Sequence, residues 1–133
     1  YFIFFNLPIV RIHFQKCFSN KKMTERPWGN YQTLFQENKT LVKKIVVKPH
    51  CRLSLQSHEH RSEHWIVVQG SGSVVIGEDT ILCSINTQLF IPRGVKHRMS
   101  NTGEEDLVFI EVQYGNILSE DDIIRYEDDY NRI

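Results

Sequence analysis

The sequence contains few cysteines, no net charge and no long apolar run. Only three of its 133 residues are cysteines, and the lack of a CxxC pair argues against a disulfide framework or a thiolate zinc site. Reduced thiols are typical of the cytoplasm, so we expect a cytoplasmic protein. Basic and acidic residues number 16 each, whereas a general nucleic-acid-binding protein has a basic excess. The balanced charge therefore makes nucleic acid an unexpected partner. No apolar run approaches the ~20 residues of a membrane span, so we do not expect a membrane as a partner either.

Two parts of the chain differ in composition. Hydrophobic residues make up 41% and charged residues 24% of the sequence, which is typical of one globular domain at this length. Residues 1–23 carry four basic residues and no acidic one, and they end in the polar stretch SNKKM. We therefore expect residues 1–23 to be an N-terminal extension, whose origin the sequence does not define, and residues 24–133 to be the folded domain.

Short segments of β-type residues follow one another through the domain. They lie at 31–35, 41–48, 65–68, 74–76, 80–83, 89–91 and 107–112. Turn signals separate them, such as Gly77-Glu78-Asp79 and Pro92-Arg93-Gly94. Many short strands at this spacing predict an all-β jelly-roll barrel. Near the end, Ser119 precedes three acidic residues and two isoleucines, a pattern that predicts a short C-terminal helix.

Histidines are concentrated in one segment. Four of the six histidines fall between positions 50 and 64, and His97 lies in a second segment, IPRGVKHRMSN. Side chains two residues apart on a strand point to the same face. Imidazoles on one face, joined by a nearby carboxylate and by a histidine from another strand, have the composition of a metal site.

The two histidine segments resemble the paired motifs of the cupin superfamily, whose fold is a double-stranded β-helix. The second motif fits in every spacing through Pro92-Arg93-Gly94, His97 and Asn101. Its first position, usually glycine, is Asn86 here, and asparagine also tolerates a left-handed turn. The resemblance therefore implies a cupin barrel with His97 as a metal ligand.

The first cupin motif fits the sequence in two registers. One takes His58-Glu59-His60 as the metal-binding pair, but it leaves too few residues before Glu63. The other takes Gln56-Ser57-His58, places His50 at a usual glycine site, and satisfies every spacing with Gln56 as the first ligand. We favour the second register, and the first stays open. Type I phosphomannose isomerases, which are also cupins, bind zinc through a similar Gln-x-His pair, a glutamate and a distant histidine.

Longer motifs give a closer resemblance over residues 26–132. They are RPWGNY, LSLQSHEHRSEHWIVVQGSG, IPRGVKHRMSNTG and IEVQYG, followed by EDDIIRYEDDYNR. These motifs are similar to those of the C-terminal domain of type II phosphomannose isomerases, which often follows a mannose-1-phosphate guanylyltransferase domain. The resemblance implies an isomerase that interconverts mannose 6-phosphate and fructose 6-phosphate. It also implies a homodimer and association with a guanylyltransferase domain. Segment 1–14, if native, could serve as an exchanged strand in that dimer.

The resemblance also implies roles for individual residues. The expected ligands of a divalent ion (Zn, Mn, Co or Ni) are Gln56, His58, Glu63 and His97. His60 and Glu59 are the nearest candidates for the base that moves the sugar proton. Arg52, Arg61 and Arg98 lie beside the ligand segments, and their planar guanidinium groups suit a phosphosugar substrate.

Two other functions fit the same residues. The domain is alternatively a non-catalytic cupin module that binds a sugar phosphate or nucleotide sugar and regulates a mannose-1-phosphate guanylyltransferase. A cupin oxygenase with ferrous iron is a third reading, which the arginines beside the site disfavour because an oxygenase needs no phosphate anchor.

Overall fold

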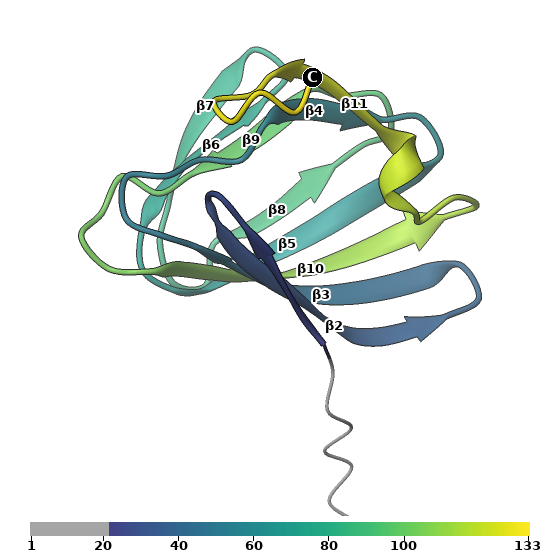
Figure 1. Ribbon diagram of the computed structural model, residues 1–133, viewed down its shortest axis with the longest axis horizontal. Coiled ribbons are helices and arrows are strands. Elements are labelled where there is room, and N and C mark those ends of the chain that lie inside the picture. Colours follow the sequence, from purple (N-terminus) through teal and green to yellow (C-terminus); the bar gives the residue numbers. More distant parts are fainter. Residues whose placement is uncertain (1–21) are drawn as a thin grey trace, which may run out of the picture.

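The computed structural model describes residues 22–133, which form two antiparallel sheets. The strands are β1 (Met23–Arg26), β2 (Gly29–Glu37), β3 (Thr40–Val47), β4 (Leu55–His58), β5 (Arg61–Gln69), β6 (Gly72–Ile76), β7 (Asp79–Cys83), β8 (Gln88–Ile91), β9 (His97–Ser100), β10 (Leu107–Gly115) and β11 (Ile123–Glu127). One sheet has the order β1-β2-β3-β10-β5-β8, and the other has the order β11-β4-β9-β6-β7. Figure 1 shows the two sheets as facing walls of one barrel. The predicted all-β jelly roll is confirmed.

Alternation along the strands fills the space between the sheets. Ile45 and Val47 of β3 point inward, as do Trp65 and Val67 of β5 and Phe109 of β10. Each such side chain contributes about 1.5–3 kcal/mol when it is fully buried. This apolar core occupies only part of the barrel interior. Near residues 61–63 and 111–113, the inward-facing side chains of β3, β5 and β10 are polar instead.

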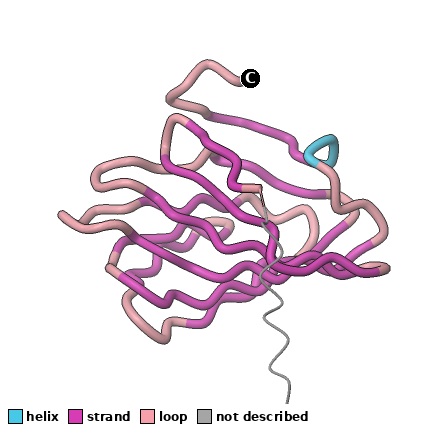
Figure 2. Tube along the Cα trace, turned by 60° about the horizontal axis from the view of Figure 1, so that its bottom comes forward, coloured by secondary structure: helices cyan, strands magenta, loops and turns pink. Residues whose placement is uncertain are grey.

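The predicted C-terminal helix is wrong. Figure 2 shows a single helical turn in the described chain, a 3-10 turn at Glu120–Asp122 in which the Ser119 side chain makes no capping hydrogen bond. The following residues form β11, which pairs antiparallel with β4 and places Arg125 opposite Gln56. The β-branched isoleucines favour an extended chain, and pairing satisfies the otherwise open edge of β4. The acidic segment therefore ends in a strand beside the histidine segment.

The predicted domain boundary lies mostly outside the described residues. Residues 1–21, which include nearly all of the expected extension and the segment 1–14 expected to exchange, are not described. The first described strand, β1, begins at Met23 and pairs with β2. Within residues 22–133, no helix is long and apolar enough to cross a membrane.

Candidate metal centre and adjoining pocket

Three predicted ligands meet inside the barrel. His58 ends β4, Glu63 lies on β5 and His97 begins β9, so the two histidines come from one sheet and the carboxylate from the other. One ligand atom from each residue lies within 4.8 Å of the other two. All three side chains are at most 2% exposed. Two imidazoles and one carboxylate in this arrangement are a donor set that suits a divalent transition metal.

Backbone carbonyls orient both imidazoles toward Glu63. His58 Nδ1 lies 3.2 Å from the Asp122 carbonyl oxygen, and His97 Nδ1 lies 2.9 Å from that of Val95. Because a carbonyl oxygen only accepts, each Nδ1 carries the proton and donates it. The Nε2 atoms then face Glu63, at 3.1 Å from Oε1 for His58 and 3.6 Å from Oε2 for His97.

His97 Nε2 is buried and has no hydrogen-bond partner within residues 22–133. Unpartnered buried polar atoms are rare in folded proteins, and a bound ion is one of the explanations for them. Burial lowers the pKa of His97, although the charge of Glu63 opposes this effect. A neutral imidazole with a buried, inward-facing lone pair fits a metal ion.

Glu63 is held as a carboxylate. Burial alone would raise the pKa of Glu63, but its close contact with His58 and the charge of the buried Arg61 guanidinium lower this pKa to about 2. Arg61 Nε and Trp65 Nε1 each donate to Glu63 at 3.1 Å. An ionised, fixed carboxylate is the form that binds a cation, and the neighbours of Glu63 hold it in that form.

The surroundings of the triad favour the register with Gln56. Gln56 pairs directly with His97 across β4 and β9, and its Oε1 accepts a hydrogen bond of 2.8 Å from Ser54 Oγ. His60 is absent from the triad, because its 47%-exposed side chain turns to Asp122, with 2.7 Å between Nδ1 and Oδ1. His50, at the usual glycine site of this register, has a φ of 60°, the left-handed conformation that glycine favours.

The other predicted residues occupy varied positions. Glu59 is exposed next to His60. Arg52 forms a two-point ion pair with Asp129, and Arg98 forms one with Glu127 at 2.9 Å. Neither arginine lines the pocket described below. Arg98 directly follows His97 on β9, and alternation turns successive side chains to opposite faces of a strand.

Arg61 is a buried residue at the centre of the site. Its side chain is 2% exposed. Besides Glu63, it donates through Nη1 to the Ser119 carbonyl oxygen at 2.9 Å, and its Nη2 lies 3.4 Å from His58 Nε2. These contacts connect the Glu63 carboxylate to the segment that leads into β11.

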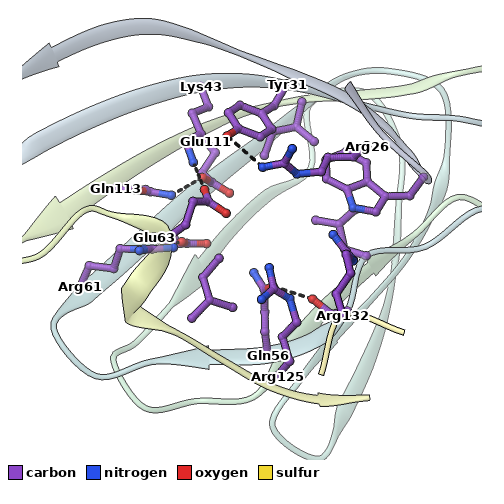
Figure 3. A pocket seen from close by; sticks show the side chains of 16 residues that line it. Arg26, Tyr31, Lys43, Gln56, Arg61, Glu63, Glu111, Gln113, Arg125 and Arg132 are labelled. Carbon is purple, nitrogen blue, oxygen red and sulfur yellow. Dashed lines mark hydrogen bonds and ion pairs between the residues drawn. The ribbon is translucent and has the colours of Figure 1, made fainter. Parts of the chain in front are cut away.

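A pocket opens beside the triad between β1, β2, β3, β10 and β11 (Figure 3). Its polar wall consists of Arg26, Tyr31, Lys43, Ser54, Gln56, Arg61, Glu63, Glu111, Gln113, Glu120, Arg125 and Arg132. Five of these side chains are basic and three are acidic. Of these basic residues, Arg61 alone was among the predicted site residues, because the other four lie outside the two cupin motifs.

One signal in the sequence marks part of this wall. In β10, the side chains of Glu111 and Gln113 are buried, whereas those of Ile110 and Val112 on the opposite face of the strand are half-buried. Polar residues at inward positions of an otherwise apolar strand indicate a site rather than a core. The motif IEVQYG therefore marks the pocket wall as well as the family, although Glu111 and Gln113 were not among the predicted site residues.

Glu111 is a second buried carboxyl group close to Glu63. Burial, together with the charge of Glu63, raises its pKa to about 8, while Lys43 and Arg61 oppose the shift. Gln113 Nε2 donates to Glu111 Oε1 at 2.5 Å. Lys43 itself forms an ion pair with Glu120 at 3.0 Å. At neutral pH Glu111 is thus mainly protonated in the metal-free protein.

The comparisons with known proteins agree with the barrel and its motifs. Residues 14–128 match the family described as "Mannose-6-phosphate isomerase C-terminal". The chain belongs to this family. Solved structures show the same fold: a cupin-2 domain, Rru_A2000 from Rhodospirillum rubrum, has a TM-score of 0.65 with 19% identity and covers 74% of this chain and 66% of its own. The capsular polysaccharide assembling protein CapF from Staphylococcus aureus has a TM-score of 0.70 with 19% identity over 81% of this chain and 34% of its own. The cupin fold is therefore confirmed.

The curated relatives that this chain matches are much longer than the chain itself. Xanthan biosynthesis protein XanB of Xanthomonas campestris is 50% identical over 107 residues, which are 80% of this chain and 23% of that protein. Alginate biosynthesis protein AlgA of Pseudomonas aeruginosa is 49% identical over 80% of this chain and 22% of its own length. Mannose-1-phosphate guanylyltransferase of Escherichia coli K12 is 44% identical over 81% of this chain and 23% of its own length.

These lengths correct the predicted function. The resemblance of the sequence motifs implied that this chain itself interconverts mannose 6-phosphate and fructose 6-phosphate. The chain spans less than a quarter of the length of the relatives it matches, and the names of those relatives describe guanylyltransferase or polysaccharide biosynthesis proteins. The activity of a whole protein is not transferable to a segment of this size, so the assignment of a complete isomerase to this chain is wrong.

Proposed function

We propose that this domain binds a divalent metal ion and, beside it, a phosphorylated sugar, and that it works together with a guanylyltransferase domain. The single observation that carries the proposal is the buried His97 Nε2 atom, which faces Glu63 and lacks a hydrogen-bond partner within the described residues. The proposal names a binding chemistry and assigns no complete reaction to the chain.

His58, Glu63 and His97 are the proposed metal ligands, with Gln56 as the fourth. The triad has the donor types of zinc, manganese, cobalt or nickel sites. A divalent ion at this position would supply Lewis acidity toward an oxygen of the bound sugar. The residues of the chain do the remaining work: Arg61 and Trp65 fix the Glu63 carboxylate, and the Asp122 and Val95 carbonyls hold the two imidazoles in the tautomer that frees Nε2.

The charge of the pocket wall supports an anionic ligand. Basic side chains outnumber acidic ones by five to three, and Glu111 with its pKa of about 8 is largely neutral at pH 7. Polar groups on β10 and β4 offer hydrogen bonds to sugar hydroxyls, while the cationic groups suit a phosphate. Both the family description and the name of the Escherichia coli relative refer to a mannose phosphate, so a mannose phosphate is the proposed ligand.

The size of the relatives supports the proposed partner. Three quarters of each curated relative lies outside the matched segment, and one of these relatives is named a mannose-1-phosphate guanylyltransferase. We propose that the present domain associates with a guanylyltransferase domain, either in one polypeptide or as a separate chain.

Calorimetric titration of mannose 6-phosphate tests the proposal. The chain is first stripped with EDTA and then reloaded separately with zinc, manganese, cobalt or nickel. We expect one metal ion per chain and sugar-phosphate binding that is at least tenfold weaker in the stripped protein. A His58→Ala variant should lose both properties, whereas His64→Ala, which alters an exposed histidine on the outer face of β5, should keep both. Absence of stoichiometric metal from the reloaded protein would overturn the proposal.

A further inference from the structure

Two arginines in the pocket have no acidic partner among residues 22–133. The other three basic side chains on the wall are neutralised by ion pairs, Lys43 with Glu120, Arg61 with Glu63, and Arg132 with Asp128. Arg26 and Arg125 form no ion pair with any described residue, although both line the same pocket. Their charges are therefore the ones available to a bound anion.

One nitrogen of the Arg125 guanidinium group, Nε, lacks any hydrogen-bond acceptor, charged or neutral, within residues 22–133. This nitrogen is buried. Arg125 lies on β11 directly opposite Gln56 of β4, and alternation turns it inward while its exposed neighbours Ile124 and Tyr126 face out. A buried guanidinium donor without an acceptor is unfavourable, so its retention at this position points to an acceptor that the chain itself does not supply.

Arg26 approaches the pocket from the other sheet. At the end of β1, its Nη2 lies 3.4 Å from the Tyr31 hydroxyl oxygen, and its guanidinium carbon lies 5.2 Å from the centre of the Tyr31 ring. These contacts hold the side chain in place but leave its charge unpaired. In Figure 3, Arg26 lies above and Arg125 below the open middle of the pocket, with Glu63 and Glu111 to the left.

We propose that Arg26 and Arg125 form the seat for the phosphate group of the bound sugar. Guanidinium groups bind phosphate oxygens through planar pairs of N–H donors, which the ammonium group of lysine does not offer. A phosphate between the two arginines would satisfy the orphaned Nε of Arg125. The sugar would then extend toward Gln56 and Glu63, which belong to the same wall.

This inference rests on the proposed function, because it locates one part of the same ligand. It differs from the sequence analysis, which placed the phosphate at Arg52, Arg61 or Arg98. Arg52 and Arg98 pair with acidic residues outside the pocket, and Arg61 is engaged with Glu63.

Titrations of the metal-loaded full chain test the seat with three probes: mannose 6-phosphate, mannose and inorganic phosphate. The variants are Arg26→Gln, Arg125→Gln and Arg125→Lys. Lys44→Gln is the matched control, since Lys44 is exposed on the opposite face of β3 from Lys43. Metal content and the melting temperature are measured for each protein. A melting temperature close to that of the unaltered chain shows that the variant is folded.

We expect Arg125→Gln and Arg26→Gln each to weaken the binding of mannose 6-phosphate and of inorganic phosphate by about ten- to a hundredfold, as for a lost hydrogen bond to a charged group. Arg125→Lys should lose nearly as much, because the charge remains but the fork is lost. Mannose binding, metal content and the Lys44→Gln control should be unchanged. Wild-type affinity for both phosphate probes in the folded glutamine variants would overturn the seat while leaving the proposed function intact. A third outcome separates the two proposals. If Arg125→Gln abolishes the binding of inorganic phosphate, but mannose 6-phosphate binds the unaltered chain no more tightly than inorganic phosphate does, the phosphate seat is supported and the proposed sugar ligand is overturned.

Discussion

His97 Nε2 and Glu63 Oε2 face each other at 3.6 Å across the barrel, from strands that belong to different sheets. A metal ion shared by these residues would connect the two sheets directly. Ligands that bind only the folded state stabilise it by about 2.7 kcal/mol at a hundredfold excess over Kd. Metal content and thermal stability should therefore change together in this protein.

Substitution of His97 should make the thermal stability of the protein independent of added or removed metal. We expect His97→Ala to lose most of its bound metal and to melt at the same temperature with and without EDTA, whereas EDTA should lower the melting temperature of the unaltered chain. Elemental analysis and thermal melts measure the two effects. His64→Ala is the control, because that histidine stacks on Phe90 outside the barrel. Full metal content in purified His97→Ala would contradict the proposed ligand set.

The register of the first motif predicts different outcomes at Gln56 and His60. Gln56 is paired with His97, whereas His60 is bound to Asp122 away from the triad. Gln56→Ala should therefore weaken metal binding about tenfold or more, as for a lost ligand or a group that orients one, and His60→Ala should change it little. Competition with a chromogenic chelator gives both affinities. The alternative register would be supported if His60→Ala emptied the site and Gln56→Ala did not.

The parts of the structure that the sequence predicted are those encoded by short-range patterns. Asn86 and Gly94 have φ values of 72° and 75°, as expected for turn positions in the second motif. Asn101 ends that motif and donates to the carbonyl oxygens of Val47 and Glu105 at 2.8 Å each. The spacing of the second motif was enough to predict the positions of its turn residues and of His97, because the backbone conformations that this motif requires are local.

The pocket wall was less accessible to sequence reasoning, because its residues meet only through long-range pairing. Arg26 and Arg125 come from opposite ends of the described chain, in the family motifs RPWGNY and EDDIIRYEDDYNR, but both lie outside the two cupin motifs from which the site residues were predicted. The Ser119 segment has the local pattern of a helix start, but pairing between β11 and β4 determines its structure instead. Such tertiary pairing overrides local propensity. Because a helix was predicted where β11 forms, the inward direction of the Arg125 side chain was not predicted.

Arg61→Lys should destabilise the protein more than a surface substitution does. Arg61 is 2% exposed and donates to both Glu63 and the Ser119 carbonyl oxygen, and a lysine cannot make both contacts in the same geometry. A lost hydrogen bond to a charged group costs about 1.5–3 kcal/mol, against about 0.5 kcal/mol for surface changes. Urea unfolding measures the difference, with Arg93→Lys at an exposed turn as control. Equal midpoints for the two variants would show that the buried contacts of Arg61 contribute little to stability.

The predicted homodimer stays a prediction, and the outer face of the larger sheet is where we expect it to form. Phe90 and Tyr114 are 52% and 55% exposed there, beside Ile66, Ile110 and Val112. Contiguous exposed apolar residues often mark an interface. Light scattering at micromolar concentration should give twice the chain mass, and Phe90→Glu should shift the protein toward the monomer. A monomeric mass for the unaltered chain would contradict the prediction.

Glu111 predicts a distinctive dependence of stability on pH in the metal-free protein. Its pKa is raised from the ordinary value of 4.5 to about 8, first by burial and then by the charge of Glu63. Between these two values the folded state holds a proton that the unfolded state releases. The contribution of Glu111 to stability is therefore fully present below pH 4.5 and is lost as the pH rises through about 8.

Glu111→Gln should remove this loss, because glutamine stays neutral and still accepts the hydrogen bond from Gln113. At about 1.4 kcal/mol per pKa unit, the wild-type free energy of unfolding should fall by a few kcal/mol relative to that of the variant between pH 5 and 8. Urea unfolding in EDTA at several pH values measures the difference, with Glu78→Gln at the exposed β6–β7 turn as control. Curves for Glu111→Gln and the unaltered chain that stay parallel across this range would contradict the raised pKa. Added metal should shrink the difference, since a cation bound at Glu63 favours the ionised form of a nearby carboxyl group.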